Sequence, residues 1–489
     1  MAMSTLSKPD TRAHVLRLTV AVAGTIVLVG FNARGLAHVP EFGLPSSFIF
    51  PGNDLVVYLE AGQAVANGES PYVTEPWTDP AVYHYSPTVA WITALVLGRT
   101  TGFDENLPFR ALAYLDLALI VALLPLSWLL WRRALSAAQP GAAAIMLLWL
   151  PVWIVYSQWF ADQNYLNIYT ALMALSGALT LAVLRRRTGL AVALAAVIVQ
   201  TKPQYAFPLA LPLLLGQWRY CARLWLGTVA ACAAIAAVTM ALAGLPFGPA
   251  LYRDYLIFLR SIPENYPWSS YYLGYNHSWY SILHWVFGMQ PWTPTAVTLL
   301  KIITFLPVGW LCARQIRRAD AARPALALGA LLALHLWSMT LLDQLWEVSL
   351  AIVAMMFLLA SDAPRVRRLA ILIGAPFALL GFIQLAGWRM APLLGTSPDQ
   401  LDITARLPVM MATALGLCAL LVWSVGRAAP QLPTYGGGIP GRGVEVRPGE
   451  GSIVLTGDGA MLLKQVQPEG GEPCSASEAL DRLGYTLTG

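Results

Sequence analysis

The sequence has little charge. Only 12% of its 489 residues are Asp, Glu, Lys or Arg, about half the share of roughly 25% in ordinary soluble proteins, whereas 57% are apolar. The 18 Trp and 34 Pro are typical of membrane proteins, in which Trp gathers at the interfaces and Pro interrupts helices. This composition argues against a soluble domain and indicates an integral membrane protein.

Several common signatures are absent as well. The five cysteines show no CxxC spacing, and four lie in or beside apolar segments, which argues against a disulfide framework or a zinc site. No Walker motif or glycine-rich dinucleotide loop occurs, which disfavours the use of nucleotide sugars in the cytoplasm. The apolar run Leu18–Phe31 follows basic residues, as in a signal peptide, but no small-x-small cleavage site comes after it. We therefore expect an uncleaved first membrane helix.

Long apolar segments recur along the chain. They predict an all-α polytopic membrane protein with a bundle of about 12 membrane helices. The predicted segments cover residues 15–31, 110–131, 141–160, 165–184, 189–200, 203–216, 224–244, 293–313, 323–342, 344–360, 366–386 and 407–426. The run 87–98 falls short of the ~20 residues that a spanning helix needs.

The distribution of basic residues predicts which side each loop faces. If 87–98 lies flat on the outer surface, one side collects most Arg and Lys and few acids, and positive loops stay in the cytoplasm. The expected location is the cell membrane, with both termini cytoplasmic and the site periplasmic or extracellular. The outer segments are then 32–109 and 245–292. The aromatics of 245–292 could form an interfacial belt or a surface for a lipid-linked sugar.

Segments 189–200 and 203–216 are too short to cross ~30 Å of hydrocarbon at 1.5 Å per residue. We expect a half-depth hairpin with Lys202 at its apex. A lysine at that depth needs an anion, a water-filled cavity or a carboxylate such as Asp162.

The sequence predicts three parts: a membrane domain over 1–428, a linker over 429–443 and a small cytoplasmic module of α+β structure over 444–489. Apolar stretches around Gly457-Asp458-Gly459 predict a β-hairpin in that module.

The first outer segment carries the most informative motifs. Asn53 or Asp54 can cap a helix that runs to about Asn67, Gly68 ends it, and Pro87 opens the next helix. A carboxylate held there could take a proton from an attacking hydroxyl, or could serve only as the helix cap. The elements Gly68-Glu69-Ser70-Pro71-Tyr72 and Tyr83-His84-Tyr85-Ser86-Pro87 follow.

Together these motifs resemble the integral-membrane GT-C glycosyltransferases, and most closely glycosyltransferase family 87, also described as domain of unknown function 2029, which includes polyprenol-phosphate-mannose-dependent mannosyltransferases. The resemblance spans about residues 15–425 and departs from the family at Asp162 and His277. It implies an inverting glycosyltransferase with Asp54 as the catalytic base. It implies a polyprenyl-phosphate sugar as donor, a glycan or glycolipid of the cell envelope as acceptor, membrane lipids as surroundings and no nucleic acid. The implied donor-binding and substrate-binding residues are Tyr58, Tyr85, Gln163, Asn164, Lys202, Asn276, His277 and Arg389.

Other hypotheses stay open at this point. A lipid-linked sugar flippase or transporter could also show broken helices and a buried lysine, although the two halves of the chain show no internal repeat. A non-catalytic scaffold or a ligase for whole glycans is a further alternative. No cofactor is expected, but Asp54, Asp79 and His84 could hold a divalent metal. The sugar, the acceptor and the oligomeric state are not specified by the sequence.

Overall fold

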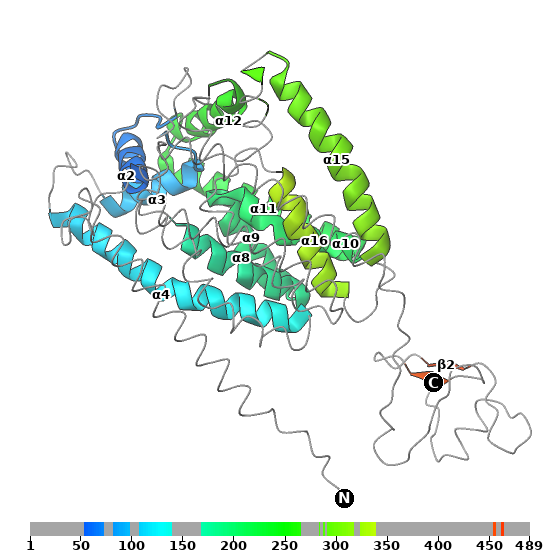
Figure 1. Ribbon diagram of the computed structural model, residues 1–489. Coiled ribbons are helices and arrows are strands. Elements are labelled where there is room, and N and C mark those ends of the chain that lie inside the picture. The colour runs from blue at the N-terminus through cyan, green and yellow to red at the C-terminus, as the bar shows by residue number, and fades with distance from the viewer. Residues whose placement is uncertain are drawn as a thin grey trace, which may run out of the picture. The chain divides into compact units, whose positions relative to one another are not determined.

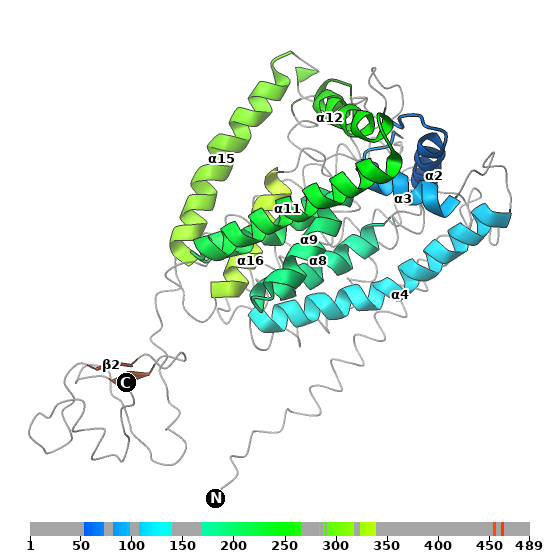
Figure 2. The ribbon, with the colours of Figure 1, turned by 180° about the vertical axis from the view of Figure 1, so that it is seen from behind.

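The computed structural model describes two separate units, one formed by residues 11–429 and one by residues 1–10 with 430–489. The residues whose structure is described are 53–72, 82–97, 107–138, 168–265, 283, 287–288, 291–316, 323–338, 453–455 and 461–463. In the first unit most of these residues are helical, and in the second they form two short strands. Figures 1 and 2 show the helices of the first unit from opposite sides.

Helices α2 (Asn53–Ala66) and α3 (Pro87–Leu97) form the first helix pair. Gly68, two residues beyond α2, has φ +78°, a conformation that glycine adopts without the steric penalty of a side chain. Proline suits the first position of α3, where its missing N–H has no helical partner. These bounds agree with the helices predicted around the motifs, and the two helices pack closely beside each other (Figure 1).

The next helices surround a break in the chain. Helix α4 (Leu107–Ala138) packs along α8 (Tyr169–Leu184), and the Trp131 indole N–H donates to the Met173 carbonyl oxygen at 3.0 Å. Helix α9 (Thr188–Thr201) then ends at Lys202. A 3-10 helix, η3 (Pro203–Ala210), and a single α-helical turn, α10 (Leu211–Leu214), continue the chain.

The break at Lys202 follows from Pro203. Proline disfavours helical dihedrals in the residue before it, and Lys202 is extended at φ −132° and ψ 94°. The interruption predicted between 189–200 and 203–216 is therefore present in the structure.

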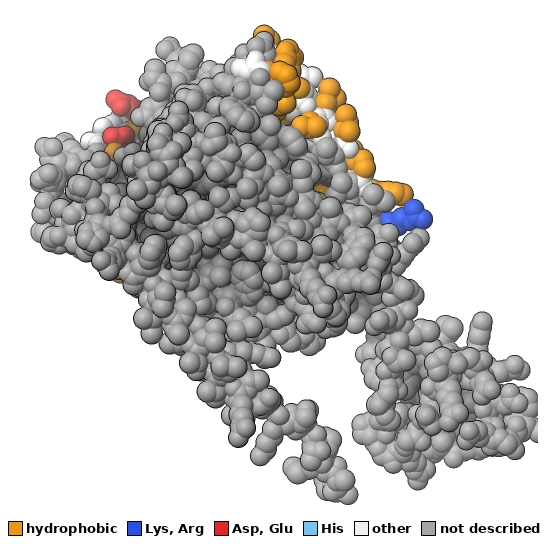
Figure 3. Space-filling view, viewed as in Figure 1, with side chains coloured by type: hydrophobic (Ala, Val, Ile, Leu, Met, Phe, Trp, Pro, Cys, Tyr) orange, Lys and Arg blue, Asp and Glu red, His pale blue; other side chains and the backbone are white. Residues whose placement is uncertain are grey.

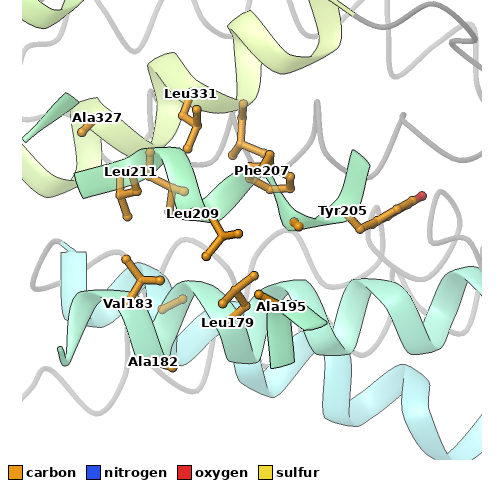
Figure 4. Packing of buried hydrophobic residues seen from close by; sticks show 14 of the residues in the cluster. Leu179, Ala182, Val183, Ala195, Tyr205, Phe207, Leu209, Leu211, Ala327 and Leu331 are labelled. Carbon is orange, nitrogen blue, oxygen red and sulfur yellow. The ribbon is translucent and has the colours of Figure 1, made fainter. Parts of the chain in front are cut away.

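A hydrophobic core holds these segments together (Figure 4). Leu179 of α8, Ala195 of α9, and Leu209 and Leu211 beyond the break are all buried, and Leu331 of α16 (Arg323–Ser338) packs against them from another part of the chain. Fully burying side chains of this size contributes about 1.5–3 kcal/mol each. This core fixes the position of Lys202 from both sides of the break.

The remaining described helices are long. Helix α11 (Trp218–Ala243) packs against α9, and α12 (Phe247–Asn265) follows it. Helix α15 (Thr293–Ile316) packs against α16. Hydrophobic side chains follow the visible face of α15, and a basic side chain lies at its lower end (Figure 3).

The prediction of about 12 membrane helices is corrected by the structure. Among the described residues, only α11 is both long and apolar enough to cross a membrane. Helices α8 and α9 have 16 and 14 residues, so at 1.5 Å per residue they cannot cover a core of ~30 Å. The predicted segments 15–31, 141–160, 344–360, 366–386 and 407–426 lie outside the described residues.

In the second unit, β1 (Ile453–Leu455) and β2 (Met461–Leu463) pair antiparallel, with Val454 opposite Leu462. This agrees with the hairpin predicted around Gly457-Asp458-Gly459.

Candidate functional site

Four tyrosines of α2 and the segments that follow it meet in one buried cluster, which we call the tyrosine cluster: Tyr58, Tyr72, Tyr83 and Tyr85. The ring centroids of Tyr58 and Tyr85 are 4.5 Å apart, those of Tyr83 and Tyr85 are 5.6 Å apart, and those of Tyr72 and Tyr83 are 5.7 Å apart. Phe258 of α12 closes the cluster at 5.7 Å from Tyr72. Such contacts contribute about 0.5–1.5 kcal/mol each beyond the area they bury.

Hydrogen bonds hold the loop before α3 in place within the tyrosine cluster. The Tyr72 hydroxyl donates to the Tyr85 carbonyl oxygen at 2.8 Å, and the Tyr83 hydroxyl donates to the Ser86 carbonyl oxygen at 3.0 Å. Burial, with a further contribution from neighbouring tyrosines, raises the pKa of Tyr72 and of Tyr83 well above the ordinary value of a phenol. Both hydroxyls therefore stay protonated and act as structural donors rather than as proton acceptors.

Lys202 lies where the tyrosine cluster meets the core of α8, α9 and η3. Its Nζ is 5.2 Å from the centroid of the Tyr85 ring and 3.6 Å from that of the Tyr169 ring. The Lys202 ammonium also donates to the Tyr169 hydroxyl. The lysine is half-buried, whereas Tyr169, at the start of α8, is buried. The two aromatic faces partly replace the water that the ammonium loses, at about 0.5–2 kcal/mol each.

His84 is the second basic group of this region. The residue is half-buried with its Nε2 atom buried, and its ring lies edge-on to Phe258, with centroids 5.6 Å apart. Burial, with a smaller contribution from the positive charge of Lys202, lowers the pKa of His84 to about 4 from its ordinary value of 6.5. The imidazole is therefore neutral at physiological pH, and Lys202 supplies the positive charge of this pair.

A polar contact links the end of α11 to the same region. The hydroxyl of Thr88 in α3 lies 3.2 Å from the Thr239 hydroxyl of α11 and 2.8 Å from the Tyr252 hydroxyl of α12. This chain of hydrogen bonds ties three helices together beside the tyrosine cluster, and it adds no charge.

The structure brings together three of the predicted site residues. Tyr58, Tyr85 and Lys202 form a continuous path of contacts. Asp54 is the second residue of α2, one turn before Tyr58, and its side chain lies outside the described structure. The other predicted residues also lie outside it: Gln163, Asn164, Asn276, His277 and Arg389, together with Asp162, the possible ion-pair partner of Lys202.

A metal site is not formed within the described part of the chain, where no three His, Cys, Asp or Glu side chains lie close enough to hold an ion. Of the candidate metal ligands, His84 is buried against Phe258, and the side chains of Asp54 and Asp79 lie outside the described residues.

Tyr169, the aromatic group nearest to the Lys202 ammonium, is not predicted from the sequence. It precedes Lys202 by 33 positions, and nothing in the local pattern of the apolar segment 165–184 distinguishes it. Tyr72 and Phe258 were likewise not singled out as partners of each other. Their contacts depend on how α12 folds back onto the loop before α3.

Comparison with models of known protein families finds a similarity near the end of the sequence. The family model of the formyl transferase C-terminal domain matches residues 419–484, a segment that contains β1 and β2 and covers less than half of the chain. It begins inside the predicted apolar segment 407–426 and does not reach the tyrosine cluster. Among curated proteins, no match to the chain was found.

This match contradicts the resemblance to the GT-C glycosyltransferases and to family 87. The family found is one of formyl transferases, so the expected inverting glycosyltransferase, its mannosyltransferase activity and the flippase alternative are corrected. The expected polyprenyl-phosphate sugar donor and the glycan or glycolipid acceptor of the cell envelope are corrected with them.

Proposed function

We propose that this chain is a membrane-located protein that binds an acidic ligand, a phosphate or a carboxylate, at Lys202. The observation that carries the proposal is the position of the Lys202 ammonium. It lies at a break between helices, half-buried against the rings of Tyr85 and Tyr169.

The chemistry of the surrounding groups favours an anion. Burial keeps His84 neutral and the Tyr72 and Tyr83 hydroxyls protonated, so Lys202 carries the positive charge among these groups. A charge-assisted hydrogen bond from Lys202 to a phosphate or carboxylate oxygen would be about twice as strong as a neutral one.

Further residues complete the proposed site. We include Asp54 as its proton acceptor, since one helical turn separates it from Tyr58. Polar ligand contacts are assigned to five residues outside the described structure: Gln163, Asn164, Asn276, His277 and Arg389. The proposal involves no cofactor.

The exposed surface of α11 supports the membrane location. Four apolar side chains of this helix are each more than half exposed: Leu226, Val229, Val238 and Leu242. Only 11% of the most apolar 18-residue stretch of the helix is buried. An apolar helix with so little cover would be unfavourable in water, whereas hydrocarbon solvates it.

The ends of the helices support the same location. The Arg132 guanidinium lies 5.3 Å from the Trp128 ring centroid, and the Arg314 guanidinium lies 5.4 Å from that of Trp310. Paired Trp and Arg near helix ends are typical of membrane interfaces. We propose that these ends face the cytoplasm and that the tyrosine cluster lies toward the opposite side.

Thermal unfolding of the purified full chain in neutral detergent tests the Lys202 site, with inorganic phosphate and acetate as probes. A ligand at ten times its Kd should stabilise the folded chain by about 1.4 kcal/mol. We expect this effect to be lost in Lys202→Gln and kept in Lys301→Gln, the matched lysine variant on α15. Equal stabilisation of wild type and Lys202→Gln by both probes would refute the site.

Formyl transfer is a second candidate function, favoured by the match of residues 419–484 to the formyl transferase C-terminal domain. In such a reaction an amine attacks the formyl carbon, a C–N bond forms, and the bond to the donor breaks as the amine loses a proton. The full chain incubated with an isotope-labelled formyl donor and amine acceptors should yield a labelled formamide detectable by mass spectrometry. Absence of labelled product at any enzyme concentration would remove this candidate.

A further inference from the structure

Five arginines lie at two neighbouring turns, at the end of α11 away from the tyrosine cluster. Arg185, Arg186 and Arg187 form the turn between α8 and α9, and Arg219 and Arg223 lie in the first turns of α11. We call these five residues the arginine patch. All five are exposed.

Contacts between the two turns hold the patch together. The guanidinium of Arg186 lies over the Tyr220 ring, 6.0 Å from its centroid, and the Tyr220 hydroxyl donates to the Val183 carbonyl oxygen at 3.2 Å. Arg186 has φ 53°, a left-handed conformation that is uncommon for a residue with a long side chain. The contact with Tyr220 thus fixes the orientation of one arginine relative to the start of α11.

The backbone of the turn is already satisfied. The N–H groups of Arg185, Arg186 and Arg187 donate to the carbonyl oxygens of Leu181, Val183 and Ala182 at 3.0, 3.1 and 2.9 Å. A ligand of the patch would therefore be held by the guanidinium groups, which offer several donors each and bind phosphate oxygens in pairs.

The charge of the patch is not balanced by nearby sequence. The chain has no Asp or Glu between Asp162 and Asp254, the interval that contains all five arginines. Like charges at this density repel one another, and an anionic partner would relieve that repulsion.

The surface beside the patch indicates which anion. On α11 the exposed Trp218 immediately precedes Arg219, and the exposed Trp225 and Leu226 follow Arg223 within one helical turn. A free phosphate makes no favourable contacts with apolar side chains, whereas a phospholipid carries a phosphate headgroup next to its acyl chains.

We infer that the arginine patch binds the headgroups of anionic phospholipids at the cytoplasmic surface of a bilayer. This inference rests on the proposed membrane location and is independent of the Lys202 site. Each arginine at such a surface contributes about a fivefold gain in affinity.

Lipid titrations of the full chain in neutral detergent test the inference. The protein carries Lys202→Gln, so that the other proposed anion site cannot respond. The probes are dioctanoyl phosphatidylglycerol, dioctanoyl phosphatidylcholine and inorganic phosphate, and the readout is the midpoint of thermal unfolding. We expect the anionic lipid to raise the midpoint by several degrees more than the zwitterionic lipid, and phosphate to have little effect.

Two sets of substitutions locate the effect. We expect the affinity for the anionic lipid to fall at least tenfold in the triple variant Arg185→Gln, Arg186→Gln and Arg187→Gln. The double variant Arg219→Gln with Arg223→Gln should also lower this affinity. It changes only the surface of α11 and leaves the turn between α8 and α9 intact, so it tests the inference even if the triple variant does not fold. Arg253→Gln with Arg260→Gln, exposed arginines of α12, is the matched control and should change nothing.

Equal responses to the two lipids would overturn the inference, and so would an unchanged response in the double variant. A response to phosphate equal to that of the anionic lipid would assign the patch to a free anion and would also overturn it. The Lys202 site is judged separately, by its own phosphate titration on the wild-type background.

Discussion

Lys202 owes its position to the residue that follows it. Pro203 forces Lys202 out of helical dihedrals, so that α9 ends and the lysine lies at the junction of two hydrophobic clusters. The interruption could be predicted from sequence because it depends on adjacent residues. The Tyr169 partner could not, since a contact across 33 positions depends on how α8 packs.

Tyr169 contributes a ring and a hydroxyl to Lys202, and two substitutions separate them. Tyr169→Phe removes only the hydroxyl that accepts from the ammonium. We expect the affinity for phosphate to fall by about two- to tenfold, the effect of losing one hydrogen bond. Tyr169→Ala also removes the aromatic face and should have the larger effect. Titrations of both variants check this order, and a Phe variant as impaired as the Ala variant would contradict it.

The lowered pKa of His84 predicts how the free energy of unfolding depends on pH. Its pKa is about 4 in the folded chain against an ordinary value of 6.5, so between these values the unfolded chain binds a proton that the folded chain does not. His84 should therefore remove about 3 kcal/mol of stability as the pH falls from 7 to 4.

The pH effect is measured as a difference. The free energy of unfolding of wild type minus that of His84→Gln, followed from pH 7 to pH 4, cancels the titration of other groups. A difference that stays flat over this interval would show that the imidazole is not buried.

At the scale of elements, the close approach of α2 and α3 depends on Gly62. A β-carbon added there would lie 2.7 Å from the Thr93 Cγ2 atom and 3.0 Å from the Ala94 backbone nitrogen. We expect Gly62→Ala to destabilise the chain by about 1–3 kcal/mol through overpacking, although alanine favours helix formation.

Gly189 in α9 is the matched control, because a β-carbon added there meets no atom within 4 Å. Gly189→Ala should be neutral or stabilising by up to about 1 kcal/mol. Chemical denaturation of the two variants would contradict this account if they behaved alike.

The destabilisation caused by one charged substitution on α11 shows whether this helix faces hydrocarbon or water. Val229 lies near the middle of the helix and is 61% exposed. If this surface faces hydrocarbon, Val229→Asp should cost about 2.5–3.5 kcal/mol and reduce the amount of chain recovered in membranes. If it faces water, the change should stay within about 0.5 kcal/mol. Ala222→Asp, also exposed but near the helix end, should have a smaller effect.

Individual elements of the fold were predictable where local chemistry determines them. The ends of α2 and α3 depend on Asn53, Gly68 and Pro87, and the hairpin of β1 and β2 depends on Gly457-Asp458-Gly459. The number of membrane helices was not predictable in this way. An apolar run does not by itself distinguish a spanning helix from a short helix that packs in a core, as α8 and α9 do.

At the scale of the whole molecule, apolar surface and basic side chains are unevenly distributed. Arginines gather where α8, α9 and α11 meet, whereas α2 carries the acidic Glu60 and α12 carries Asp254 together with the exposed Arg253 and Arg260. The described helices therefore combine one strongly basic region, a region of mixed charge and the exposed apolar side chains of α11. That arrangement matches a bilayer, with one charged surface and a hydrocarbon interior.

The functional assignment also changes at this scale. The motifs around Asp54 resemble those of one enzyme family, whereas the family model matches residues 419–484, far along the chain. The resemblance depended on short elements of two to five residues, which recur among unrelated sequences. Most of the formyl transferase match, residues 430–484, belongs to the second unit, and the Lys202 site belongs to the first.

The membrane location of the helical unit is part of the proposed function, and it is the claim on which the lipid-binding inference depends. It is tested most directly by separating cell membranes from the soluble fraction and washing them with alkaline carbonate, which releases proteins held only at the surface. We predict that the full chain stays in the washed membrane pellet. Recovery of folded chain in the soluble fraction before the wash would contradict the account.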